Sequence, residues 1–62
     1  MPEVIVHAAK GRTVEQKRGL LADITEAVVK NFGATRDSVT VTIVEAELEN
    51  KSKGGVPFSD RH

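Results

Sequence analysis

Apolar and polar residues alternate along two segments of the chain, which flank a longer segment with helical spacing. Residues 3–9 contain the β-branched run Val4-Ile5-Val6, with apolar side chains at both odd and even positions. This pattern predicts a strand that is covered on both faces. Residues 38–45 alternate more strictly and predict a second strand. Its two faces are Val39, Val41 and Ile43 on one side and Thr40, Thr42 and Val44 on the other.

The segment between these strands has the pattern of an amphipathic helix from about residue 14 to residue 32. Its apolar residues recur at i, i+3, i+4 and i+7, opposite a charged face. Thr13 and Gln16 have the spacing of a capping box at the start. Gly33 is suited to a left-handed stop at the end. The apolar positions are Leu20, Leu21, Ile24, Ala27, Val28 and Phe32; the charged positions are Lys17, Arg18, Asp23, Glu26 and Lys30.

Strand, helix and strand of matched length predict a right-handed βαβ unit with parallel strands, of the α+β class. One helix covers one face of such a sheet and leaves the other face bare, so another copy of the chain is expected to cover it. Residues 46–62 are polar and irregular, and Gly54-Gly55 predicts a tight turn there. Val56 and Phe58 could extend a C-terminal arm or hairpin to a neighbour. We expect a single domain over residues 1–62.

Composition narrows the ways in which so short a chain can be stabilised. A chain of 62 residues buries only roughly 60% of its unfolded surface. The absence of Cys excludes disulfides and thiolate metal sites, and the two histidines, His7 and His62, are too few and too far apart to indicate zinc. Self-association is the remaining source of stability. We expect no metal and no cofactor, and we expect His7 to be a packed or interface residue.

Charge and hydropathy exclude several kinds of partner. Nine Lys and Arg residues balance nine Asp and Glu residues, and both aromatic residues are Phe. This composition does not indicate nucleic-acid binding, which needs a basic face or stacking rings. No apolar run approaches the length of a membrane span, and no signal-peptide pattern opens the chain. We therefore expect a cytoplasmic protein without nucleic-acid or membrane partners.

Candidate chemistry lies at the two ends of the first predicted strand, at Pro2 and Arg12. Removal of Met1 would turn Pro2 into a secondary amine, and α-amino groups have a reference pKa of roughly 7.7–8.0. A nearby cation or apolar wall lowers that pKa and favours the neutral base. The alternative is that Pro2 is only a residue tolerated at a strand start. Arg12 could bind a carboxylate or be a solvated turn residue.

With these features together, the chain resembles the 4-oxalocrotonate tautomerase family over essentially its whole length. The matching features are Pro2, Gly11-Arg12, Glu15-Gln16-Lys17, the alternating second strand and Gly54-Gly55. The resemblance implies a βαβ protomer that assembles through dimers, typically into homohexamers. It also implies that Pro2, after loss of Met1, is a general base, or a general acid in relatives that hydrate or dehalogenate. Arg12 matches the arginine that binds the substrate carboxylate.

The activity that this resemblance implies is cofactor-independent enol–keto tautomerisation of a small 2-hydroxydienoate or 2-oxo acid. One amine that accepts and then returns a proton can serve both steps of the reaction. A guanidinium can hold the carboxylate and offset the developing enolate charge. A cation about 6 Å from the amine, at an effective dielectric constant of about 20, would contribute about 2.8 kcal/mol, or about two pKa units. Arg12 would therefore also keep Pro2 neutral if it lay that close.

Two positions depart from the family pattern. The best-characterised members carry a second arginine where this chain has Thr40, and an aromatic residue where it has Lys51. Thr40 cannot neutralise a second carboxylate, whereas the ammonium of Lys51 could replace part of the missing charge; Arg36 and Lys53 are weaker candidates. Arg12, Thr40 and Lys51 are thus the predicted substrate-binding residues, and the changes favour a smaller or monocarboxylic enol.

Two alternatives to tautomerisation stay open at this point. The first keeps the fold but uses Pro2 as an acid, in a hydratase, dehalogenase or decarboxylase. The second is a non-catalytic subunit of a homo-oligomer, or of a hetero-oligomer whose partner supplies the missing arginine.

Overall fold

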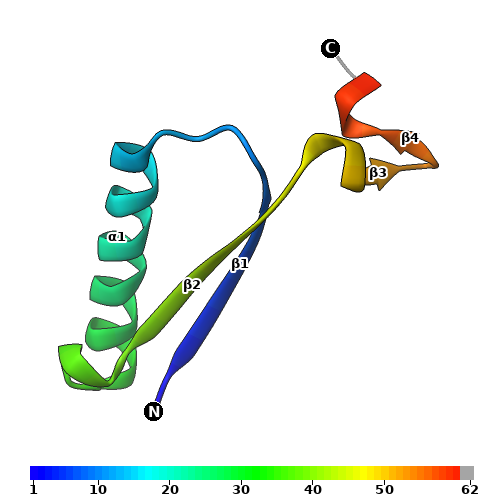
Figure 1. Cartoon of the computed structure of the whole chain (residues 1–62). Coiled ribbons are helices and arrows are strands. Elements are labelled where there is room, and N and C mark those ends of the chain that lie inside the picture. The colour runs from blue at the N-terminus through cyan, green and yellow to red at the C-terminus, as the bar shows by residue number, and fades with distance from the viewer. Residues whose placement is uncertain (61–62) are drawn as a thin grey trace.

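The computed structural model describes residues 1–60 and contains two parallel strands, one long helix and a small hairpin arm (Figure 1). Strand β1 (Glu3–Ala9) leads into helix α1 (Val14–Phe32), which returns the chain to strand β2 (Thr40–Ala46). β1 and β2 pair in parallel, which confirms the predicted βαβ unit of the α+β class. The second strand begins at Thr40 rather than at residue 38, because Arg36–Ser38 form a single 3-10 turn.

The ends of α1 are fixed by the residues that the sequence indicated. The Thr13 hydroxyl accepts a hydrogen bond of 3.1 Å from the amide of Gln16, and the Gln16 side chain accepts one of 2.9 Å from the amide of Thr13. This is the predicted capping box. At the other end Gly33 has φ 70° and donates its N–H to the Val29 carbonyl, because glycine adopts this left-handed conformation without steric cost.

The register of the sheet decides which residues α1 covers. Glu3 lies opposite Thr40 and Ala9 lies opposite Ala46. Even-numbered residues of β1 and odd-numbered residues of β2 face α1: Val6, Ala8 and Ile43 line one pocket together with residues of the helix. These strand residues are half-buried, as are Leu21, Ile24 and Val28 on the facing side of α1.

The opposite face of the sheet is uncovered in the isolated chain. It carries Ile5 and His7 of β1 and Thr42 and Val44 of β2, all exposed. Ile5 is 53% exposed and Val44 is 43% exposed. No side chain of residues 1–60 is fully buried in this single chain. The two apolar faces predicted for the first strand are therefore present, but the chain itself covers one of them.

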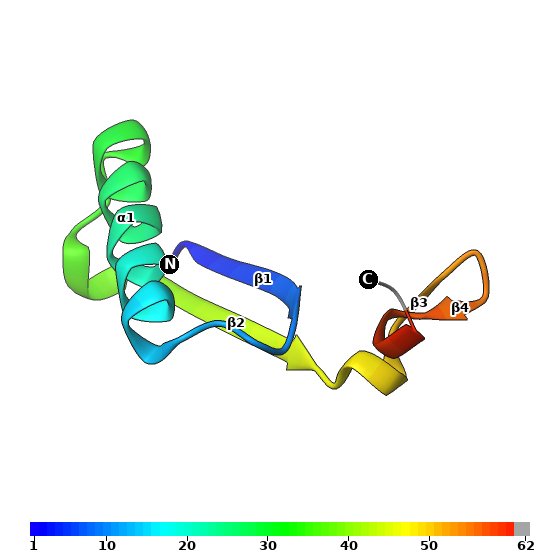
Figure 2. The ribbon, with the colours of Figure 1, turned by 90° about the horizontal axis from the view of Figure 1, so that it is seen from above.

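The C-terminal arm, residues 47–60, extends from the end of β2 away from the helix and sheet (Figures 1 and 2). It contains the short strands β3 (Ser52–Lys53) and β4 (Val56–Pro57), which form an antiparallel hairpin between two 3-10 turns, Leu48–Asn50 and Phe58–Asp60. This confirms the predicted hairpin. The arm gives the chain an elongated shape of 42 × 23 × 14 Å.

The isolated chain is more extended than a compact domain of its size. Its radius of gyration is 14.6 Å, whereas a compact chain of this length has about 10.6 Å. Its accessible surface is 4852 Å², against about 3,900 Å² for a compact monomer of this mass. The bare sheet face and the projecting arm account for this shape, and both favour self-association.

Within residues 1–60, no helix has the length and apolar character needed to cross a membrane. The cytoplasmic location predicted from the sequence stays a prediction.

The bare sheet face leads to the first testable prediction, the replacement Val44→Asp. If another copy covers Val44, burying an unpaired carboxylate there is unfavourable by several kcal/mol. We expect sedimentation velocity to show a shift from the wild-type oligomer to smaller species. The matched control is Ala22→Asp, because Ala22 lies between Arg18 and Glu26 on the exposed stripe of α1 and should sediment as the wild type does. Wild-type sedimentation of Val44→Asp would mean that no copy covers this face.

Candidate functional site

The two residues that the sequence singled out for chemistry lie at opposite ends of β1. Pro2 precedes the strand and Arg12 follows it. The seven steps from Pro2 to Ala9 span about 23 Å at about 3.3 Å per residue in an extended strand. Figure 1 shows the N-terminus at one end of the sheet and the turn into α1 at the other. Arg12 therefore does not lie about 6 Å from Pro2 of its own chain.

Pro2 and Thr40 are the pair of predicted site residues that the fold brings together. The amide of Thr40 donates a hydrogen bond of 3.0 Å to the carbonyl of Pro2, which extends the β1–β2 ladder to the second residue of the chain. Pro2 is half-buried, and Thr40 is exposed beside it. Met1 is 95% exposed, so an aminopeptidase can reach the bond between Met1 and Pro2. Its cleavage would leave an amine that the sheet holds in place.

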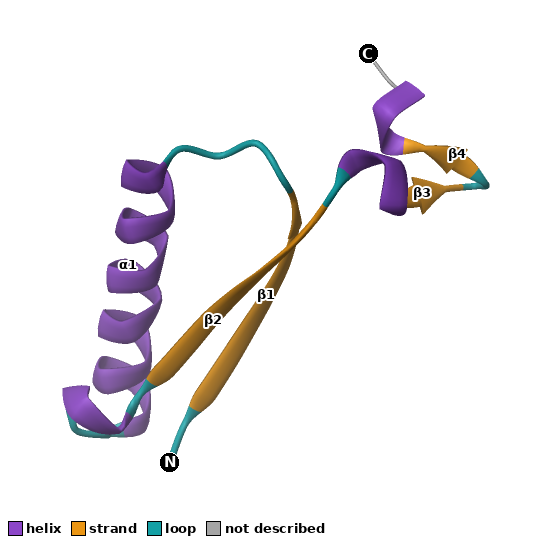
Figure 3. Cartoon of the chain, in the orientation of Figure 1, coloured by secondary structure: helices purple, strands orange, loops and turns teal. Residues whose placement is uncertain are grey.

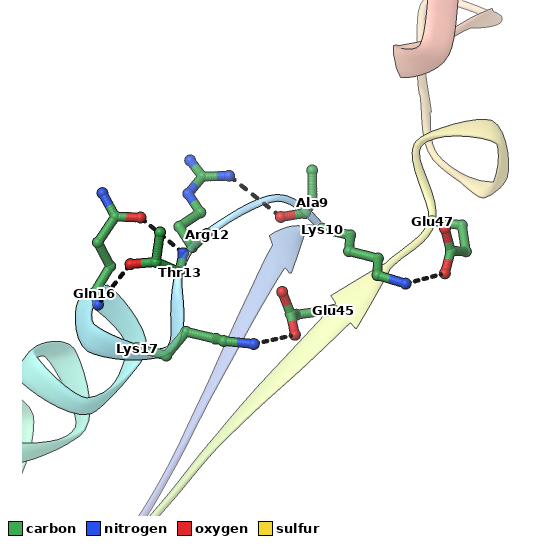
Figure 4. A network of polar contacts seen from close by, with 8 residues as sticks. All are labelled: Ala9, Lys10, Arg12, Thr13, Gln16, Lys17, Glu45 and Glu47. Carbon is green, nitrogen blue, oxygen red and sulfur yellow. Dashed lines mark hydrogen bonds and ion pairs between the residues drawn. The ribbon is translucent and has the colours of Figure 1, made fainter.

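Arg12 lies at the junction between β1 and α1 (Figure 4). Its Nη1 donates a hydrogen bond of 3.2 Å to the Ala9 carbonyl, which leaves most of the five guanidinium N–H groups available to a ligand. Arg12 also borders a pocket of about 240 Å³ between α1 and the sheet. The pocket has apolar and polar lining residues: the apolar ones are Val6, Ala8, Ala9, Leu20 and Ile43, and the polar ones are Arg12, Gln16, Lys17 and Glu45.

Two lysines near Arg12 are already paired with carboxylates (Figure 4). Lys17 Nζ lies 3.0 Å from Glu45 Oε1, and Lys10 Nζ lies 2.9 Å from Glu47 Oε1. The hydrogen bond and the charge of Glu47 raise the pKa of Lys10 above its ordinary value, so Lys10 stays charged in neutral solution. Of these three cations, Arg12 is the one without a carboxylate partner in residues 1–60. It is therefore the best placed of the three to bind an external carboxylate.

Lys51 lies on the C-terminal arm, between the turn Leu48–Asn50 and β3. Figure 3 shows this arm beyond the end of the sheet that is opposite the N-terminus. The Lys51 Nζ is 5.9 Å from the centroid of the Phe58 ring, and the Lys51 carbonyl accepts a hydrogen bond of 2.7 Å from the Phe58 amide. Sequence reasoning assigned Phe58 only to a short arm. The signal that could have found this contact is the Gly54-Gly55 turn, because a hairpin that folds there brings Lys51 opposite Phe58.

The remaining candidates have structural partners elsewhere. Arg36 donates from both Nε and Nη2 to the Glu26 carboxylate of α1, so its charge is already paired. Among residues 1–60, no three His, Cys, Asp or Glu side chains gather in a way that could hold a metal ion. His62 lies outside the described residues.

Sequence comparisons relate this chain to known enzymes. The family model described as tautomerase enzyme matches residues 2–61. A probable tautomerase from Bradyrhizobium diazoefficiens is 52% identical over 61 residues, which cover 98% of this chain and 91% of the relative. The 2-hydroxymuconate tautomerase of Bacillus subtilis is 40% identical over 60 residues, 97% of each chain.

Solved structures agree with this relationship. A 4-oxalocrotonate tautomerase isozyme from Methylibium petroleiphilum superimposes with a TM-score of 0.90 at 40% identity, covering 97% of this chain and 94% of the other. A protein studied for trans-3-chloroacrylic acid dehalogenase activity matches with a TM-score of 0.78 at 30% identity, covering 90% and 97%. A heterohexameric 4-oxalocrotonate tautomerase from Chloroflexus aurantiacus shares the fold, with a TM-score of 0.91 at 22% identity and full coverage of both chains.

The unpaired guanidinium of Arg12 leads to a binding prediction. Arg12→Gln should weaken the binding of a small unreactive carboxylate by about 10- to 100-fold, because a hydrogen bond to a charged group contributes about 1.5–3 kcal/mol. Isothermal titration calorimetry measures the change. Arg36→Gln is the matched control, since Glu26 already occupies Arg36, and its affinity should equal that of the wild type. Equal losses in both variants would show a general charge effect rather than a site at Arg12.

Proposed function

Because this chain belongs to the tautomerase family and its named relatives include tautomerases, we propose that it catalyses enol–keto tautomerisation with Pro2 as the acid–base group once Met1 is removed. The observation that carries the proposal is the hydrogen bond of 3.0 Å between the Thr40 amide and the Pro2 carbonyl. It ties the second residue to the sheet, so the amine would sit on a rigid strand rather than on a frayed end. A general base needs such positioning to reach its proton.

In the proposed reaction the neutral Pro2 amine takes the hydroxyl proton of a 2-hydroxydienoate or another enol. The oxygen lone pair forms the carbonyl, and the carbon end of the former double bond takes a proton back from the Pro2 ammonium. No electrons are gained or lost, so the chemistry needs no cofactor. The amine is neutral again at the end of the cycle.

The Arg12 that serves Pro2 is proposed to come from a second copy of the chain. β1 has β2 on one side only, and its other edge is a ready template for another strand. Antiparallel pairing of two β1 edges would set Pro2 of one copy beside the Arg12 end of the other. A two-fold axis would then build this site twice.

A shared site of this kind would let Arg12 act on both the substrate and the base. The guanidinium would bind the substrate carboxylate and stabilise the developing enolate. Its positive charge would also lower the pKa of the Pro2 amine. Arg12 has no carboxylate partner within residues 1–60, which leaves its charge available for both roles.

The bare sheet face calls for further copies beyond this dimer. An edge-paired dimer would have one continuous sheet with its helices on one side and Ile5, His7 and Val44 exposed on the other. Stacking of three such dimers by their bare faces would bury these residues. We therefore propose a homohexamer, a trimer of dimers; a hetero-oligomer built in the same way is the alternative.

Thr40 and Lys51 are proposed to decide which substrate fits. Thr40 lies next to Pro2 and offers a hydroxyl, not a charge, and Lys51 would reach a neighbour's Pro2 through the projecting arm. A dicarboxylate would then meet Arg12 at one end and a single lysine at the other. This arrangement favours a small monocarboxylic enol.

The similarity to a structure studied for dehalogenase activity supports one second candidate, in which a charged Pro2 acts as an acid in dehalogenation or a related hydration or decarboxylation. The pH–rate profile separates the two. An ascending limb in kcat/KM reports a proline that must lose its proton, as tautomerisation requires. A descending limb reports a proline that must keep it. Absence of turnover with every enol would favour the non-catalytic subunit.

The proline mechanism leads to a third prediction. Pro2→Ala should lower kcat/KM for 2-hydroxymuconate and phenylenolpyruvate by about 10²- to 10⁴-fold, the range that a positioned acid–base group contributes. Absorbance spectroscopy follows the loss of the enol. The chain has one other proline, Pro57, and Pro57→Ala controls for general effects of the replacement. Turnover of Pro2→Ala at the wild-type rate would exclude the proposed base.

A further inference from the structure

The C-terminal arm holds a lysine over an aromatic ring, and the proposed reaction makes no use of that ring. The Nζ of Lys51 lies 5.9 Å from the centroid of Phe58, within the distance at which a ring face attracts a cation. Both residues are half-buried, whereas Ser52, Lys53 and Val56 of the hairpin between them are exposed. Lys51 and Phe58 are therefore more protected from solvent than the hairpin residues between them that are exposed.

The backbone of the hairpin fixes this pair. Ser52 lies opposite Pro57 and Lys53 lies opposite Val56, and Lys51 and Phe58 flank the open end of these two pairs. A hydrogen bond of 2.7 Å from the Phe58 amide to the Lys51 carbonyl joins the two flanking residues. Residues directly opposite each other in an antiparallel pair present their side chains to the same face. The hairpin and this hydrogen bond thus bring the Phe58 ring close to the Lys51 ammonium.

Lys51 differs from Lys10, Lys17 and Arg36 in what it contacts. Lys10, Lys17 and Arg36 each pair with a glutamate, and such a carboxylate neutralises the charge. An aromatic ring attracts an ammonium without neutralising it. Lys51 forms no ion pair within residues 1–60, so no carboxylate there offsets its charge while the ring restricts its position.

We propose that Phe58 is a positioning residue, which holds the Lys51 ammonium as a fixed positive charge beside the anionic enol substrate in a neighbouring copy's site, in addition to the Arg12 that binds the carboxylate. This inference rests on the proposed function and deepens it. A long lysine side chain loses conformational freedom when it binds a ligand. The ring restricts that freedom before the substrate arrives. A fixed ammonium near Pro2 would also lower the pKa of the proline amine.

The test is a double-mutant cycle in steady-state kinetics on the assembled protein, with Phe58→Leu, Lys51→Met and the double variant. Phe58→Leu should raise KM at least threefold, change kcat less than twofold and move the ascending limb of the pH–rate profile to higher pH. Phe58→Tyr keeps a ring face and should restore both values. Phe58→Leu should add nothing when Lys51 is already Met. A KM increase of the same size in the Lys51→Met background would overturn the proposal.

Lys30→Met is the charge control, because Lys30 is exposed on α1 and its replacement removes the same positive charge away from the arm. Its KM should stay near that of the wild type; an increase equal to that of Lys51→Met would show that only the net charge of the protein matters, which would also overturn the proposal.

Fluorinated phenylalanine at position 58 keeps the proposal testable if Phe58→Leu does not assemble. Fluorine withdraws electron density from the ring face and weakens its attraction for a cation, while the shape of the ring changes little. KM should rise stepwise with the number of fluorines. A constant KM across the series would contradict the positioning role.

A proton NMR measurement separates this inference from the proposed function. The ring should shift the Lys51 ε-methylene resonances upfield in the resting protein, and Phe58→Leu should remove that shift; its absence from the wild type would overturn the inference. If Pro2→Ala turned over substrate at the wild-type rate, the proline mechanism would be refuted. The proposed role of Phe58 and Lys51 in that mechanism would be refuted with it, even if the Lys51 resonances were shifted. Loss of turnover in Pro2→Ala with an unchanged KM in Phe58→Leu would refute the positioning role and leave the proline mechanism standing.

Discussion

The parallel pairing of β1 and β2 under a single helix is the constraint on which the rest of this structure depends. It places Val6, Ala8 and Ile43 against α1 and turns Ile5, His7 and Val44 to the opposite, uncovered face. It also leaves one edge of each strand unpaired, and unpaired edges favour association with other strands. A chain with no fully buried side chain among residues 1–60 needs that association for a core. We therefore propose that assembly is part of how this sequence folds.

The same constraint separates the residues of the proposed site. A parallel βαβ unit runs its first strand in one direction only, so Pro2 and Arg12 lie at opposite ends of β1, and the arm carries Lys51 still farther along the same direction. Joining a second copy in the reverse direction would bring such ends together. The interactions that complete the core would then also complete the site, and a chain that failed to assemble would lose both.

The features that could be predicted from the sequence depend on interactions between residues that are close together in the chain. The capping box of Thr13 and Gln16 and the stop at Gly33 depend on neighbouring residues, and the strand faces follow from side-chain alternation. The start of β2 was predicted two residues too early, because Ser38 continues the apolar–polar alternation although its backbone belongs to a 3-10 turn. The contact between Lys51 and Phe58 depends on which residues of the hairpin lie opposite each other. The sequence predicts this only after the turn has been assigned to Gly54-Gly55. The subunit that supplies Arg12 depends on assembly, which one chain does not specify.

The central claim is that Pro2 and Arg12 act across two copies of the chain, and subunit mixing tests it most directly. Pro2→Ala and Arg12→Ala are each expected to be inactive as pure oligomers. If they are dissociated, mixed in equal amounts and reassembled, the account predicts about one quarter of the wild-type activity, because half of random pairs are mixed and each mixed pair has one intact site of two. Activity that stays at the level of the two separate variants, in a mixture shown to have exchanged subunits, would contradict a shared site.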